Sequence, residues 1–189
     1  MKTLAFISYS RKDKSVAHWL HSKLEKYPYP KVSISIENRP PDKKYLRPIF
    51  IDVKDLSVDE HPFNEKIKAA LRDSRFLILI CSKHSVYSEF VNKEVTYFLE
   101  VHNFDYSKIV PIFIDNVDDN IPPSIAKSSV MQRHFPIYNT ALSEKSEANT
   151  YCFYQIAAYL LGIDFSYLYN RYENYATKGK KINTNKQKE

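Results

Sequence analysis

Apolar residues form four short, nearly unbroken runs along the chain, at positions 4–9, 49–51, 76–81 and 109–114. Runs of this length without regular polar alternation are typical of strands that are covered on both faces. Strands of this kind occur mainly in parallel sheets, because helices pack on both sides of such sheets. The pattern therefore predicts four buried strands in one parallel sheet.

The segments between these runs repeat apolar residues every three or four positions, which is typical of helices with one buried face. Asp13 and Ser88 are predicted to cap the first and third of these helices, and Gly162 is predicted to end the fourth. A fifth helix is predicted over 164–172. The four stripes consist of Ala17, Leu20, Leu24 and Tyr27; of Phe63, Ile67, Ala70 and Leu71; of Phe90 or Val91, Val95, Phe98 and Leu99; and of Phe153, Ile156, Ala157, Leu160 and Leu161.

The alternation of strand and helix predicts an α/β fold, with an open parallel sheet and helices on both faces. Ligands of such sheets bind in the crevice outside the carboxyl ends of the strands. That rule points to the polar segments that follow the first three runs, at 8–13, 52–60 and 82–88.

The length of 189 residues fits one domain with a tail. We predict a domain over 1–175 with long insertions at about 28–48 and 115–149, and a short strand at 134–138 within the second. The segment 176–189 is predicted to be a basic disordered tail, because it contains five Lys and one Glu among polar residues. Most of the net charge of +6 lies in this tail, so we expect neither nucleic acid nor membrane as a partner.

Composition excludes several kinds of site. The chain has only two glycines, so neither a Gly-x-Gly-x-x-Gly loop nor a Walker A loop can be written. Its six histidines show no metal-ligand spacing, and no metal is expected. Cys81 and Cys152 lie within apolar runs and are interpreted as buried thiols of a reducing compartment. No apolar run is long enough to span a membrane and no signal peptide is visible, which predicts a cytoplasmic protein.

Three places carry candidate chemistry, each with a plain structural alternative. Arg11 offers a planar fork for a diphosphate, or it is a solvated neighbour of a helix cap. Asp52 ends the second strand and contacts substrate or orients a turn. Phe90 and Glu94 lie one turn apart on the third predicted helix, where a ring and a carboxylate suit a cationic heteroaromatic substrate. Alternatively, Phe90 belongs to the core and Glu94 is an ordinary surface residue.

Together these segments resemble a Toll/interleukin-1 receptor (TIR) domain of the bacterial kind. The resemblance covers roughly residues 1–165 and rests on three boxes in order. The first is FISYSRKD at 6–13, the second is PIFID at 48–52, and the third is SRFLILICS at 74–82 with SEFVNKEV at 88–95. The resemblance implies a flavodoxin-like fold.

The resemblance also implies a site for cleaving the nicotinamide–ribose bond of NAD+. The family's catalytic glutamate maps onto Glu94, with Phe90 where Trp is more usual. The loop that gates the site maps onto 53–62 and lacks the glycine that many members carry. The implied substrate-binding residues are Phe6, Ser8, Tyr9, Ser10, Arg11, Asp52, Leu56, Ser82 and Phe90.

The function implied by the resemblance is that of an NAD+ nucleosidase, ADP-ribosyl cyclase or transferase. NAD+ is the substrate, and no cofactor is expected. A homo-oligomer is expected in the active state, with a product that activates a separate effector in a Thoeris-type anti-phage system. The alternative is a non-catalytic TIR module that binds other proteins; a weaker alternative is a secreted effector that perturbs host signalling. The product, the trigger and the role of residues 28–48 stay open.

Overall fold

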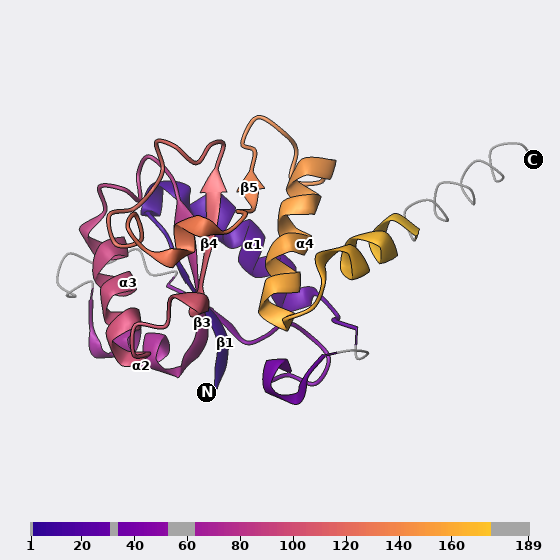
Figure 1. Ribbon diagram of the computed structural model, residues 1–189, viewed down its shortest axis with the longest axis horizontal. Coiled ribbons are helices and arrows are strands. Elements are labelled where there is room, and N and C mark those ends of the chain that lie inside the picture. Colours follow the sequence, from indigo (N-terminus) through magenta and orange to yellow (C-terminus); the bar gives the residue numbers. More distant parts are fainter. Residues whose placement is uncertain (1, 31–33, 53–62, 175–189) are drawn as a thin grey trace, which may run out of the picture.

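The computed structural model describes residues 2–30, 34–52 and 63–174 and contains one parallel sheet (Figure 1). The strands lie in the order β2-β1-β3-β4-β5. This is the flavodoxin-like order, so the predicted fold class is confirmed. The strands are β1 (Thr3–Ser8), β2 (Ile49–Ile51), β3 (Ser74–Cys81), β4 (Ile109–Ile114) and β5 (Ile137–Tyr138).

Within the described ranges, four helices cover the two faces of the sheet, as the sequence pattern predicts. One face carries α1 and α4, and the other carries α2 and α3, which Figure 1 shows on opposite sides of the strands. Residues 165–174 form a further helical segment after α4, in agreement with the predicted fifth helix. The helices are α1 (Lys14–Lys26), α2 (Glu65–Asp73), α3 (Glu89–Val101) and α4 (Glu147–Leu161).

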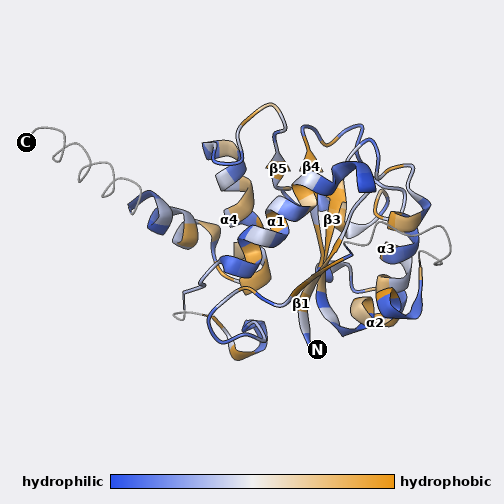
Figure 2. Cartoon of the chain, turned by 180° about the vertical axis from the view of Figure 1, so that it is seen from behind, coloured by the Kyte–Doolittle hydropathy of each residue, from blue (hydrophilic) through white to orange (hydrophobic). Residues whose placement is uncertain are grey.

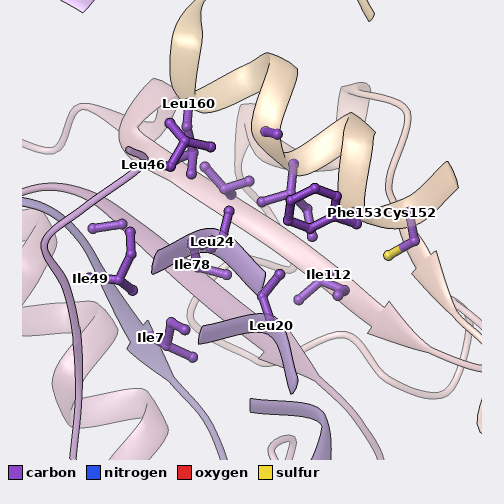
Figure 3. Packing of buried hydrophobic residues seen from close by; sticks show 14 of the residues in the cluster. Ile7, Leu20, Leu24, Leu46, Ile49, Ile78, Ile112, Cys152, Phe153 and Leu160 are labelled. Atoms are coloured by element: carbon purple, nitrogen blue, oxygen red, sulfur yellow. The ribbon is translucent and has the colours of Figure 1, made fainter. Parts of the chain in front are cut away.

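Side chains of the central strands alternate between two separate apolar clusters. In β3, Leu77 and Leu79 pack toward α2 and α3, whereas Ile78 and Ile80 pack toward α1 and α4. This alternation follows from the pleat, since successive side chains of a strand point to opposite faces. Figure 2 shows the hydrophobic strands between the helices, and Figure 3 shows part of the α1–α4 cluster.

The two cysteines are buried free thiols, as predicted, and each belongs to a different cluster. Cys81 lies in the α2–α3 cluster and Cys152 in the α1–α4 cluster. Burial raises the pKa of the Cys152 thiol to about 12 and that of Cys81 well above its usual value. Both thiols therefore stay protonated and unreactive in the folded protein.

The three predicted helix ends are confirmed in position. The Ser88 hydroxyl accepts a hydrogen bond from the amide of Val91 at the start of α3. Gly162 ends α4 in the left-handed conformation, with φ at 61°. Asp13 is the N-cap residue of α1, as predicted, but its side chain makes no hydrogen bond to the helix. The carboxylate is instead bonded to another loop, as described below.

The long connection 115–149 supplies the edge strand β5 within the predicted range 134–138. The connection 28–48 is tied to the amino-terminal side of the sheet: the amide of Leu4 donates to the carbonyl oxygen of Pro48 at 2.8 Å. Within this connection, the carboxylate of Asp42 accepts hydrogen bonds from the side chain of Arg47 and from the amides of Tyr45 and Lys44. Together these hydrogen bonds lower the pKa of the Asp42 carboxyl to about 2. The part of this connection over 34–48 lies away from the carboxyl edge where ligands are expected.

Gly162→Ala is expected to lower the free energy of unfolding by roughly 1–3 kcal/mol. An added Cβ would lie 2.2 Å from the side-chain nitrogen of Asn38, and the left-handed backbone disfavours alanine. Urea denaturation would measure the loss. Asn170→Ala, at an exposed position of the next helical segment, serves as the control and should stay close to the parent protein. Equal stability of the two variants would contradict the prediction.

The predicted tail 176–189 lies outside the described residues. Within the described ranges, no helix has the length and apolar character needed to cross a membrane.

Candidate functional site

The carboxyl ends of β1 and β2 and the first turns of α3 meet at one edge of the sheet. Ser8 is the last residue of β1 and is fully buried. Asp52 follows the last residue of β2, which is paired with β1 through Ile7 and Ile51. Glu94 lies in α3, which packs over the same end of the sheet. The parallel register therefore brings together residues that are far apart in sequence.

The central contact joins the two predicted residues Ser8 and Glu94. The Ser8 hydroxyl donates a hydrogen bond to Oε2 of Glu94 at 2.6 Å, across 86 positions of sequence. The carboxyl of Glu94 thus points inward to the end of β1 and not into bulk solvent. Among the described residues, no Lys or Arg forms an ion pair with it.

The environment raises the pKa of the Glu94 carboxyl from 4.5 to about 8. Burial is the main cause, because a charged carboxylate is poorly solvated there, and the negative charge of Asp52 adds to it. The hydrogen bond from Ser8 acts in the opposite direction. A buried carboxyl group whose pKa is raised toward neutrality is a candidate for a functional residue.

Other predicted residues surround this pair. The Tyr9 hydroxyl donates to the backbone oxygen of Asp52 at 2.7 Å and so connects the ends of β1 and β2. Ser10 is partly buried, and Arg11 is exposed at the start of a short 3₁₀ helix, Arg11–Asp13. Phe90 precedes Glu94 by one turn of α3, and 37% of its surface is exposed. The ring is therefore available to a ligand.

Phe6 and Ser82 are placed differently from the remaining predicted residues. Phe6 is fully buried in the α2–α3 cluster and stacks on Phe50 with ring centroids 5.1 Å apart. Ser82 is also buried, and its hydroxyl donates to Asp13 at 2.6 Å. Both lie beneath the edge of the sheet, which suits support of the site more than contact with a ligand. Leu56 and the predicted gating loop 53–62 lie outside the described residues.

Asp13 and Phe50 also belong to this region. The sequence pattern predicts Asp13 as a helix cap and indicates no role for Phe50 in the site. Nothing in the spacing of Asp13 indicates a partner 69 positions away. The described residues contain no group of three His, Cys, Asp or Glu side chains that could hold a metal ion. The arrangement at Glu94 can instead accept hydrogen bonds from hydroxyl groups or stabilise a nearby positive charge.

A separate hollow of about 490 Å³ lies along α3. Its lining includes Phe63, Tyr87, Lys93 and Tyr97, but not Glu94. This hollow is therefore distinct from the Ser8–Glu94 pair.

The structure is similar to the TIR domains in a solved structure described as the activated Roq1 resistosome directly recognizing the pathogen effector XopQ. The two share 16% identity at a TM-score of 0.47, over 81% of this chain and 96% of the other. A search of curated proteins finds no match. The family model described as TIR domain matches residues 5–148, which is most of the sequence, and the chain therefore belongs to the TIR domain family.

Proposed function

We propose that the protein is an enzyme that breaks the bond between nicotinamide and ribose in NAD+, with Glu94 as its catalytic residue. The observation that carries the proposal is the inward-facing Glu94 carboxyl, which accepts a hydrogen bond from Ser8 at the edge of the sheet where ligands of such folds generally bind. Membership of the TIR family supports it, because the family includes NAD+-cleaving enzymes as well as assembly modules.

The reaction places modest demands on the protein. The nicotinamide ring of NAD+ is already cationic, so it leaves as a neutral base when the C1′–N bond breaks and the bonding electrons go to the ring nitrogen. Positive charge then develops on the ribose, as in glycoside hydrolysis. In its ionised form, the Glu94 carboxylate accepts hydrogen bonds from the ribose hydroxyls and stabilises that charge. A nucleophile then bonds to C1′ and releases its proton.

The surrounding residues take supporting roles in this proposal. Ser8 orients the carboxyl of Glu94, and Phe90 packs against the nicotinamide or ribose. Arg11 binds the diphosphate with its planar fork. Burial, with a smaller contribution from the negative charge of Asp52, raises the pKa of Glu94 to about 8, so the free enzyme holds a proton there near neutral pH. The cationic nicotinamide favours loss of that proton when NAD+ binds.

The identity of the acceptor sets the product. Water gives ADP-ribose, attack by the adenine of the same molecule gives a cyclic isomer, and another small molecule gives a conjugate. We propose that the product activates a separate effector, in a system of the Thoeris anti-phage type, and that the active form is a homo-oligomer joined by TIR–TIR contacts. Resemblance to bacterial TIR proteins supports this setting.

Incubation of concentrated protein with NAD+ is expected to release nicotinamide, which liquid chromatography would measure. The value of kcat/KM is expected to rise as pH increases through about 8, because this ratio reports ionisation of the free enzyme. The profile of kcat should lie at lower pH, since bound NAD+ favours the carboxylate. No release at any concentration or pH would favour the non-catalytic assembly module.

A further inference from the structure

The carboxylate of Asp13 is buried although it stands at the start of a helix. Only 6% of the residue is exposed, and the side chain makes no hydrogen bond to α1. Its Oδ2 accepts a hydrogen bond of 2.6 Å from the hydroxyl of Ser82. Ser82 is buried as well, with 2% of the residue exposed. The bond joins the loop after β1 to the loop after β3.

Ser82 is also bonded within its own loop. Its hydroxyl oxygen accepts hydrogen bonds from the amides of His84 and Ser85, at 3.0 and 3.1 Å. The Ser85 hydroxyl accepts from the Ser82 amide and donates to the Ser82 carbonyl oxygen. These bonds close the turn that leads to Ser88 and α3. The position of Ser82 is thus fixed relative to the helix that bears Glu94.

Asp13 also closes the segment that contains Arg11. The amide of Asp13 donates to the carbonyl oxygen of Ser10 at 2.7 Å, which forms the short turn over these residues. One end of the segment is fixed by β1, and the other by the bond from Asp13 to Ser82. The exposed Arg11 therefore extends from a backbone held on both sides.

We propose that Asp13 and Ser82 form a positioning pair that holds the Arg11 segment in register with α3 and so controls how tightly the diphosphate of NAD+ binds. This inference rests on the proposed function for its effect on NAD+, but the tie between the loops can be tested without it. Ser82 acts in this way through Asp13 and not as a contact to the substrate.

Hydrogen–deuterium exchange tests the tie without any substrate. Asp13→Ala is expected to speed exchange at the amides of residues 10–13 and also of residues 82–86, whereas Asp13→Asn keeps an acceptor oxygen and should change both less. Asp105→Ala is the matched control, since Asp105 also accepts a short bond from a serine, but from Ser107 in its own turn. Faster exchange in only one segment, or equal effects of Ala and Asn, would overturn the inference. If Asp13→Ala does not fold, Ser82→Ala takes its place and is expected to speed exchange in both segments.

Steady-state kinetics then tests the consequence for NAD+. Asp13→Ala is expected to raise KM about tenfold with little change in kcat, the sign of lost binding that is equal in ground and transition states. Arg11→Ala should add little to KM in that background, because a misplaced Arg11 already contributes little. Additive effects on KM would overturn the positioning role. If the parent protein releases no nicotinamide, the proposed function fails while the exchange result still decides whether the tie exists.

Discussion

Glu94→Gln is expected to lower nicotinamide release by roughly 10²–10³-fold. Glutamine has nearly the same shape, but it carries no negative charge to stabilise the developing positive charge on the ribose. Because that interaction is strongest in the transition state, kcat and kcat/KM should fall together. Chromatography of nicotinamide at saturating and limiting NAD+ would separate the two parameters.

Glu100→Gln provides the matched control for this change. Glu100 lies on the same helix, α3, is exposed, and undergoes the same change from carboxyl to amide in the variant. It should retain the parent rate. Circular dichroism of both variants would establish that the fold is kept. Equal rates for Glu94→Gln and the parent protein would remove Glu94 from the mechanism.

Glu94→Gln is also expected to be more stable than the parent protein in alkaline solution. The folded protein raises the pKa of Glu94 from 4.5 to about 8, so it binds this proton more tightly than the unfolded chain does. The stabilisation from that proton is complete below about pH 4.5, declines as pH rises, and is lost above about pH 8. Glutamine cannot ionise and keeps its contribution throughout.

The free energy of unfolding of Glu94→Gln, relative to that of the parent, is expected to increase by roughly 2–4 kcal/mol from acid to alkaline solution. This range allows for the partial exposure of the residue. Urea denaturation of both proteins at about pH 5, 7 and 9 would measure this increase. A constant difference between Glu94→Gln and the parent across this range would show that Glu94 ionises as it does in the unfolded chain.

The strands and helices follow from sequence because each has a clear local cause. Unbroken apolar runs mark the buried strands, and Gly162 and Ser88 mark helix ends through their own backbone and side-chain chemistry. β5 is harder to predict, since two residues carry too little pattern, and it was expected only as a strand somewhere in 134–138. The local pattern therefore predicts long strands and helices more accurately than short ones.

Contacts between distant segments lie beyond such patterns. The bond between Ser8 and Glu94 spans 86 positions, and resemblance places both residues at the site without indicating that one holds the other. Asp13 has the residue type and the position of a helix cap, yet its Oδ2 accepts a hydrogen bond from Ser82 and not from α1. The burial of Phe6 follows from the unbroken apolar run of β1, which predicts a strand covered on both faces; its neighbours Ala5 and Ile7 pack on the opposite face of the sheet.

The distribution of cysteines offers a way to observe each half of the core separately. The sequence contains only Cys81 and Cys152, one on either side of the sheet. A maleimide reagent can modify either one only after its own layer opens, since thiolate formation needs access to water. Mass spectrometry of the labelled peptides would thus tell whether α2 and α3 detach from the sheet before, after or together with α1 and α4.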